Sequence, residues 1–179
     1  MDNQKRQYNE LAYQLVSTRI LGTRKGSDEP AYEHSVRVSE ALKKYEYPER
    51  VVIAGLLHDI VEDGGVSLQE LVEFGFSEQV VHLVDLCSHD EAGENKDARW
   101  VKMIARLIDA NDKDAWVIKL ADVMDNAQHC GTLRPDRAAF IREVKVPLML
   151  SVTKDVLGDE GIWNELNNLS KTTYGKSAE

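Results

Sequence analysis

The segment with the most evident chemistry is LLHDIVED at residues 56–63, which ends a nearly unbroken apolar run. It carries four ionisable side chains, those of His58, Asp59, Glu62 and Asp63. On a helix, residues four apart project from nearly the same side, so we expect all four to share one arc. Three carboxylates in a last helical turn lie against the negative end of the helix dipole, and burying them unpaired is costly. We therefore expect a positive partner, either a cluster of Arg and Lys or a divalent metal.

Two more residues favour a metal site over the alternative, in which residues 58–63 are simply solvated at the surface. His34 lies in the first turn of a helix expected over residues 31–45, and Asp122 lies inside an apolar helix expected over residues 114–129. Neutral imidazole and carboxylate are ligands of first-row transition metals. Two histidines and two carboxylates suit Mn²⁺, Fe²⁺ or Mg²⁺, with positions left for water and substrate. The predicted ligands are His34, His58, Asp59 and Asp122.

Helical periodicity runs through almost the whole chain. No segment shows sustained alternation with a period of two, which would indicate a strand. Apolar spacing and Gly, Pro and Ser signals predict helices over about residues 3–21, 31–45, 48–63, 67–75, 77–87, 98–110, 114–129 and 138–157. Ser67 and Glu70 form a predicted capping box, and Ser77 is a predicted N-cap. The sequence therefore predicts an all-α, compact multi-helix bundle.

Length and charge limit the class of protein. The 179 residues, 42% hydrophobic, fit a single domain over residues 1–179, with a polar C-terminal tail from about residue 165. A net charge of −9 argues against a nucleic-acid polymer as partner, while a small anionic substrate stays compatible. The apolar stretches are too short to span a membrane and no signal peptide is evident, so we expect a cytoplasmic protein without membrane association. Cys87 and Cys130 have no motif spacing and are expected to be reduced thiols.

The pattern His…His-Asp…Asp resembles that of HD-domain metal-dependent phosphohydrolases. The stretches AYEHSVRVSEAL, AGLLHDIVEDG and VIKLADVMDN are similar to those of the hydrolase domain of RelA/SpoT-type guanosine alarmone enzymes. That subfamily has His-Asp-x-x-Glu-Asp, found here at residues 58–63, and Lys-Leu-Ala-Asp with Asn four residues on, found here at residues 119–122 with Asn126. The likeness runs from about residue 8 to about residue 155. It implies an HD-domain fold and a stand-alone hydrolase without synthetase and regulatory domains.

The resemblance also implies an activity and roles for particular residues. The activity is removal of the 3′-pyrophosphate of guanosine tetra- or pentaphosphate, usually with Mn²⁺. Glu62 and Asp63 correspond to the acidic pair that activates water and handles the leaving group, and the four predicted ligands correspond to the family's metal ligands. The candidates for binding the nucleotide are Asn126, Arg24 and Lys25 in the loop GTRKGSDEP, Arg99 in KDARW and, more weakly, Arg142.

Three departures from the family's sequence pattern leave the identity of the substrate open. Gly64 follows Glu-Asp where the family has Thr, Ser35 follows the first histidine where Pro is common, and the basic loop is short. One alternative is an HD phosphohydrolase for another nucleotide, such as a deoxynucleoside monophosphate or a dinucleotide cofactor. Another is a metal-dependent nucleotide sensor without turnover. The oligomeric state has no signature in the sequence.

Two other features compete with this site. His82, Asp85 and His89 are spaced as on one helical face and could form a second metal site, but we interpret them as three surface residues beside a polar loop. The tryptophans are interpreted as core or boundary anchors rather than base-stacking platforms, and they are Trp100, Trp116 and Trp163.

Overall fold

The structure, a computed structural model, describes residues 2–89 and 95–174. Its helices are α1 (Asp2–Arg19), α2 (Glu33–Lys44), α3 (Glu49–Leu57), α4 (Leu68–Glu73), α5 (Glu78–Cys87), α6 (Lys96–Ala110), α7 (Lys113–Gln128), α8 (Pro135–Ala139), α9 (Val146–Leu157) and α10 (Gly161–Tyr174). A 3-10 turn (Cys130–Thr132) precedes α8, and a π-helix (Phe140–Lys145) joins α8 to α9. The described residues contain no strand beyond one isolated bridge between Thr23 and Pro30. The prediction of an all-α bundle is confirmed.

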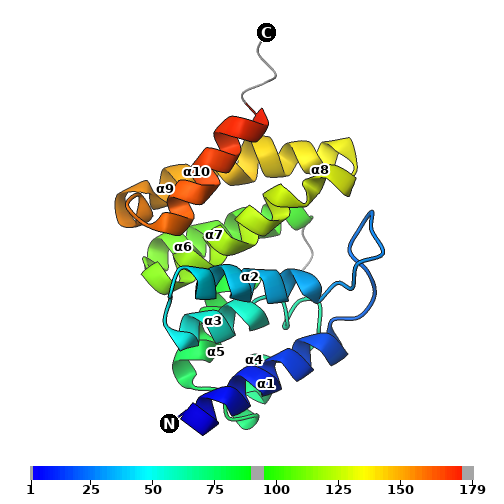
Figure 1. The fold of residues 1–179 in the computed structure, drawn as a ribbon, viewed down its shortest axis with the longest axis vertical. Helices are drawn as coiled ribbons and strands as arrows, with labels where there is room; N and C mark the ends of the chain where they lie inside the picture. The colour runs from blue at the N-terminus through cyan, green and yellow to red at the C-terminus, as the bar shows by residue number, and fades with distance from the viewer. Residues whose placement is uncertain (1, 90–94, 175–179) are drawn as a thin grey trace.

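Two helices form the centre of the bundle. Every residue from Val51 to Leu57 of α3 is buried, and α7 buries most of its length. A helix that is apolar on all sides is stable only when it is covered on all sides. In Figure 1, α2 and α3 lie across the middle, α1 lies at the end that carries the N-terminus, and α9 and α10 lie at the opposite end. Helix α7 contacts α2, α3, α5, α9 and α10, so it links the two halves of the bundle.

Helix starts follow the predicted capping signals. The Ser67 side chain accepts a hydrogen bond from the Glu70 N–H, and the Glu70 carboxylate accepts one from the Ser67 N–H, which completes the predicted capping box. Ser77 caps α5 as predicted, through the N–H of Val80. The polar loop predicted over residues 88–97 falls partly on residues 90–94, which lie outside the described residues.

The predicted helix over residues 48–63 is wrong at its end. Helix α3 ends at Leu57, and residues 58–63 form turns in which the Ile60 N–H bonds the Leu57 carbonyl and the Asp63 N–H bonds the Asp59 carbonyl. Gly65 then takes a positive φ of 61° and turns the chain away. His58 and Asp59 therefore leave the end of α3 directly, rather than sharing a regular helical arc with Glu62 and Asp63.

Two differences concern the C-terminal third. The predicted helix 138–157 is interrupted by the π-helix, which ends two residues before Pro147, whose ring nitrogen has no N–H to continue the α-helical ladder. Helix α10 occupies the region expected to begin a polar tail, because Ile162 and Leu166 are fully buried and fix it to the bundle.

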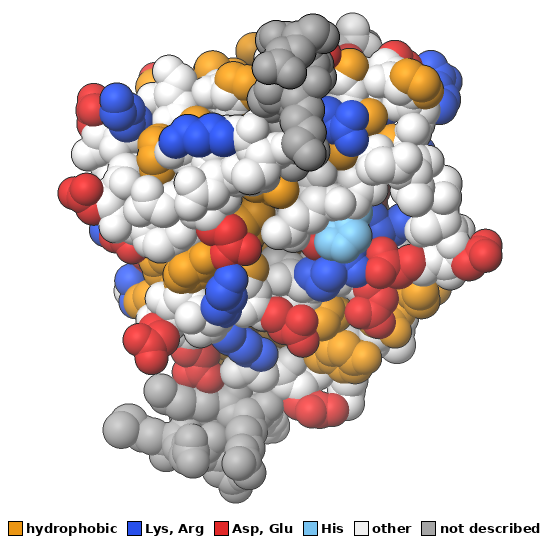
Figure 2. Space-filling view, turned by 45° about the horizontal axis from the view of Figure 1, so that its top comes forward, with side chains coloured by type: hydrophobic (Ala, Val, Ile, Leu, Met, Phe, Trp, Pro, Cys, Tyr) orange, Lys and Arg blue, Asp and Glu red, His pale blue; other side chains and the backbone are white. Residues whose placement is uncertain are grey.

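The cysteines, the tryptophans and the charged surface agree with what the sequence leads us to expect. Cys87 and Cys130 are buried and free, Trp100 and Trp116 are buried, and Trp163 is half-buried, as expected. On the face in Figure 2, acidic and basic side chains are interspersed rather than separated into large patches. No described helix has the length and apolar character needed to cross a membrane.

Candidate metal centre and substrate cavity

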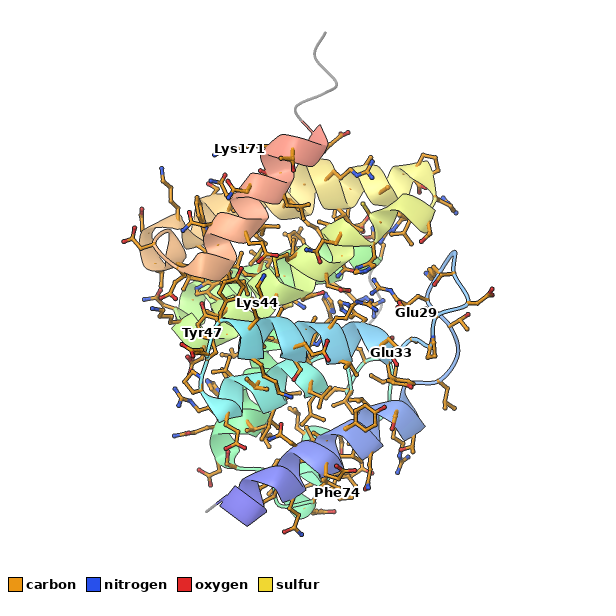
Figure 3. All side chains as sticks on the ribbon, viewed as in Figure 1. Glu29, Glu33, Lys44, Tyr47, Phe74 and Lys171 are labelled. Carbon is orange, nitrogen blue, oxygen red and sulfur yellow. The ribbon has the colours of Figure 1, made fainter. Side chains whose placement is uncertain are left out.

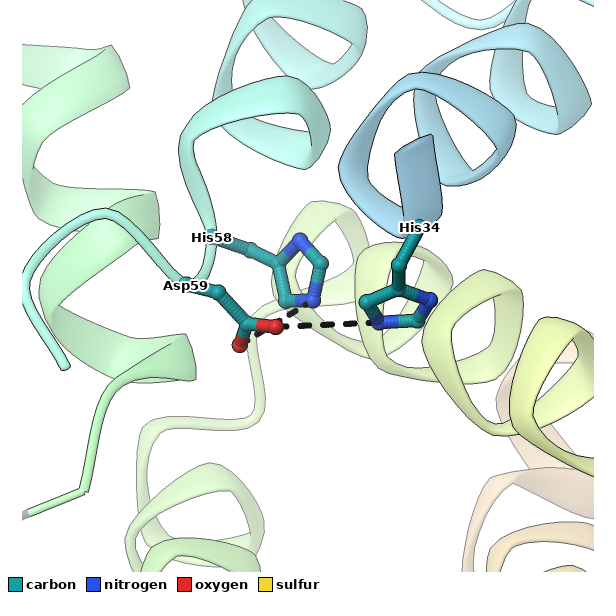
Figure 4. A group of neighbouring side chains, drawn as sticks. All are labelled: His34, His58 and Asp59. Carbon is teal, nitrogen blue, oxygen red and sulfur yellow. Dashed lines mark ion pairs between the residues drawn. The ribbon is translucent and has the colours of Figure 1, made fainter. Parts of the chain in front are cut away.

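His34, His58 and Asp59 converge between α2 and the end of α3. One potential ligand atom from each lies within 4.8 Å of the others. His58 Nε2 is 3.2 Å from Asp59 Oδ1, and His34 Nε2 is 3.7 Å from Asp59 Oδ2 (Figure 4). Ligands on a metal with bonds of about 2.1 Å are about 3 Å apart when adjacent and about 4 Å apart when opposite. The spacing of these atoms therefore fits a common ion.

Asp122 of α7 joins the same cluster. Its Oδ1 lies 3.2 Å from His34 Nε2 and 3.9 Å from His58 Nε2. Its Oδ2 pairs at 2.9 Å with the buried ammonium of Lys119, one turn earlier on α7. Burial raises the pKa of Asp122, but Lys119 and the two histidines hold it well below its usual range. The structure thus brings the four predicted ligands together from three segments of the chain.

The histidine tautomers suit a metal. His58 Nδ1 donates to the Gly55 carbonyl at 2.8 Å, so Nε2 carries the lone pair, yet this atom is buried and has no hydrogen-bond partner among the described residues. His34 Nδ1 lies 2.6 Å from Asp125 Oδ2, which likewise directs Nε2 toward the cluster. A buried polar atom without a partner is costly. A divalent cation would satisfy it, so the residues present fit a metal.

Asp125 is a residue of the site that we did not predict. Its carboxylate accepts hydrogen bonds from His34, from Arg37 Nε at 2.6 Å and from Arg24 at 2.7 Å. Burial raises the pKa of Asp125, but these three donors hold it well below its usual range. Glu29, labelled in Figure 3 on the loop beside α2, accepts a second bond from Arg37 at 2.5 Å. The available signal was a second Asp, one turn after Asp122, in an otherwise apolar helix.

The protonation of His34 depends on these carboxylates. Burial lowers the pKa of His34, whereas hydrogen bonds with Asp122 and Asp125 raise it, to about 9 overall. Without a cation, the ring therefore holds a proton at neutral pH. A metal that binds Nε2 must displace this proton, so binding is expected to weaken as the pH falls.

A cavity of about 450 Å³ opens beside the cluster. Every predicted site residue contributes to its wall except His58, which is fully buried behind it, and Arg142. The predicted residues in the wall are Arg24, Lys25, His34, Asp59, Glu62, Asp63, Arg99, Asp122 and Asn126. The volume lies within the range of small-molecule pockets.

Glu62 is held by His89. The Glu62 Oε1 atom accepts hydrogen bonds from the His89 backbone N–H at 2.8 Å and from His89 Nδ1 at 2.5 Å. The interpretation of His89 as a surface residue was therefore wrong: it is partly buried and lines the cavity. His82 is exposed and Asp85 is partly exposed, as expected of surface residues, and the described residues contain no second group suited to a metal.

The loop before α2 brings Arg24 to the cavity. Arg24 donates to Asp125 and, at 3.1 Å, to the Asn126 side-chain oxygen, while the Asn126 amide donates to Asp122 at 2.5 Å. Gly26 fixes the loop with a φ of 81°, and a Cβ there would lie 2.1 Å from the Thr132 carbonyl oxygen. Only glycine permits both this φ and this close backbone approach.

Arg142, the weakest of the predicted nucleotide contacts, does not line the cavity. Several residues that do line it carried no predicted role, among them Lys119, Arg137, Phe140 and Lys145. Lys119 stands in the Lys-Leu-Ala-Asp motif, which was a usable signal. Lys145 follows no motif, and only the fold brings it here.

Comparisons with known proteins agree with the fold. A solved structure described as a metazoan ortholog of SpoT that hydrolyzes ppGpp superposes with a TM-score of 0.77 at 22% identity, over 93% of this chain and 96% of that one. A guanosine-3′,5′-bis(diphosphate) 3′-pyrophosphohydrolase of Borreliella burgdorferi is 33% identical over 73% of this chain, and one of Haemophilus influenzae is 31% identical over 83%. The chain spans about a fifth of the length of these curated relatives.

The family itself follows from a match to a family profile. The profile of the family described as HD domain matches residues 11–146, which include all four predicted metal ligands and both acidic residues at 62 and 63. This range covers more than half of the chain. The protein therefore belongs to the HD domain family.

Proposed function

We propose that this protein is a Mn²⁺-dependent hydrolase that converts guanosine 3′,5′-bis(diphosphate), or the corresponding pentaphosphate, to its 5′-phosphorylated product and pyrophosphate. The observation that carries the proposal is the assembly of His34, His58, Asp59 and Asp122 beside one cavity that also contains Glu62 and Asp63. The names of the curated relatives support the same substrate.

The chain's own residues would perform the binding and proton transfers. A bound divalent metal would neutralise phosphoryl oxygens and lower the pKa of a water molecule. The carboxylates of Glu62 and Asp63 would take the proton of the attacking water and return one to the departing 3′-oxygen. Asn126 and Arg24 would contact the nucleotide, and Lys119 would hold the Asp122 carboxylate in place.

The direct test is turnover of guanosine 3′,5′-bis(diphosphate) by the purified protein with Mn²⁺. We expect GDP and pyrophosphate in equal amounts, and loss of turnover when EDTA removes the metal. Absence of turnover at micromolar enzyme would refute the proposal. Release of orthophosphate from another nucleotide in a substrate panel would instead identify an HD phosphohydrolase of different specificity.

We expect Asp125→Asn to weaken Mn²⁺ binding about 10- to 100-fold, the usual effect of losing a carboxylate behind a histidine ligand. The amide keeps the shape but loses the charge that holds His34, Arg37 and Arg24. Isothermal titration with Mn²⁺ measures the change. Asp155→Asn, at an exposed site on α9, is the matched control and is expected to bind Mn²⁺ normally. Equal affinities for the two variants would contradict the role of Asp125.

We expect Gly26→Ala to raise KM for the nucleotide with little change in Mn²⁺ affinity. The added Cβ meets the Thr132 carbonyl, so the loop must shift and move Arg24 and Lys25 away from the cavity. Steady-state kinetics together with a Mn²⁺ titration check this. The control is Gly131→Ala, where a Cβ meets no atom within 4 Å. Unchanged KM in Gly26→Ala would exclude the loop from substrate binding.

A further inference from the structure

One part of the cavity wall carries positive charge that the proposed chemistry leaves unused. It is formed by the first turns of α6, by α8 and by the π-helix. Its cations are Arg99, Arg137 and Lys145, and its aromatic rings are those of Trp100 and Phe140. We call these five residues the basic wall.

Lys145 is the centre of the basic wall. Its Nζ lies 5.0 Å from the centroid of the Trp100 ring and 6.0 Å from that of Phe140, as in cation–π contacts. None of the described carboxylates forms an ion pair with it. Burial lowers the pKa of Lys145 to about 8, although Asp122 and Asp59 act in the opposite direction. An ammonium group that is enclosed and lacks an anion is stabilised by any anion that enters the cavity.

The other two cations of the basic wall, Arg99 and Arg137, have one carboxylate partner between them. Arg137 pairs with Asp97 at 2.9 Å and lies over the Phe140 ring. Arg99 has a buried Nε without a hydrogen-bond partner among the described residues. Among the described residues, Asp97 is the one carboxylate that pairs with a cation of the basic wall, and it pairs with Arg137 alone. Arg99 and Lys145 are therefore left to bind an anion.

We propose that Lys145 and Arg99 form a second anion subsite, which binds a 5′-phosphate group while the 3′-diphosphate lies at the metal cluster. The preferred substrates are then nucleotides phosphorylated at both the 3′ and the 5′ position. The inference rests on the proposed function, because that function assigns the 3′-diphosphate to the metal cluster. Planar guanidinium and compact ammonium groups are both suited to phosphate oxygens.

The subsite predicts that the effect of Lys145 depends on the substrate. Methionine at this position keeps the length and the contact with Trp100 but removes the charge. We expect Lys145→Met to lower kcat/KM for guanosine 3′,5′-bis(diphosphate) about 10- to 100-fold, the usual effect of a lost charged hydrogen bond. For guanosine 3′-diphosphate with a free 5′-hydroxyl, the loss is expected to be less than about threefold. Equal losses for both substrates would overturn the subsite, because a structural or catalytic defect affects both alike.

Two controls accompany this comparison. Lys154→Met, at an exposed position on α9, is expected to leave both substrates unaffected. Arg99→Gln is expected to show the same dependence on the 5′-phosphate as Lys145→Met, and it tests the subsite even when Lys145→Met does not fold. Thermal unfolding by circular dichroism identifies variants that do not fold.

A binding experiment separates failure of the subsite from failure of the proposed function. Isothermal titration with GDP, without metal, examines the 5′-diphosphate contact directly and requires no turnover. We expect wild type to bind GDP at least about tenfold more tightly than Lys145→Met does. Undetectable binding to wild type, or equal affinity for both proteins, would overturn the subsite whether or not the protein hydrolyses the bis(diphosphate).

Discussion

Replacement of His58 by alanine is expected to abolish both metal binding and hydrolysis. His58 is fully buried, its Nδ1 is committed to the Gly55 carbonyl, and its Nε2 has no hydrogen-bond partner among the described residues. Alanine removes the nitrogen ligand and leaves Asp59 and Asp122 to repel each other across the empty space. We expect no stoichiometric Mn²⁺ in the purified variant and a loss of kcat/KM of at least about 10³-fold, corresponding to about 4 kcal/mol of transition-state stabilisation. Metal analysis and steady-state kinetics measure both effects.

Two further variants make this result interpretable. His82→Ala removes a histidine whose side chain is 58% exposed on α5, and it is expected to bind metal and turn over normally. Asp59→Asn keeps the side-chain shape and removes one ligand charge, so it is expected to lose metal without leaving a cavity in the core. If His58→Ala folds, retains Mn²⁺ and turns over at the wild-type rate, then the cluster does not hold the metal.

The sequence predicts the central helices and the proximity of the two histidines to Asp59 and Asp122, for a physical reason. The apolar runs that form α3 and α7 are long, so their burial can be predicted from pattern alone. A charged residue inside such a run, as Asp122 is, must have a partner, and the identity of the partner is limited by its chemistry. Both constraints, the burial of a long apolar run and the need of a buried charge for a partner, can be recognised from neighbouring residues in the sequence.

What the sequence did not predict depends on contacts between distant segments. The sequence shows Asp125 only as a second Asp in α7, and its role becomes clear when His34 and Arg37, about ninety positions earlier, lie against it. The same holds for Lys145, which needs Trp100 from α6 beside it. The end of α3 at Leu57 is similar, because His58 and Asp59, which follow it, lie against Asp122 and His34 from other helices. Helix ends and residues behind the ligands are therefore the least predictable parts of the site.

Glu62→Gln is expected to separate metal binding from catalysis. Glutamine keeps the length of the side chain and an oxygen that accepts the His89 backbone N–H, so the local structure should persist. It removes the carboxylate that would exchange a proton with water or with the leaving group. We expect kcat to fall about 10²- to 10⁴-fold, with Mn²⁺ affinity and thermal stability close to those of the wild type. Kinetics, a Mn²⁺ titration and a melting curve measure the three quantities.

The matched control is Glu40→Gln, at an exposed position of α2, which makes the same chemical change away from the cavity and is expected to be silent. The result also discriminates between two roles for Glu62. If it only positions His89, glutamine should preserve activity, because it keeps the accepting oxygen. If it transfers the proton, activity should fall while metal affinity stays constant. Loss of metal together with activity would instead place Glu62 among the ligands, and the division between the His-Asp pair and the acidic pair would be wrong.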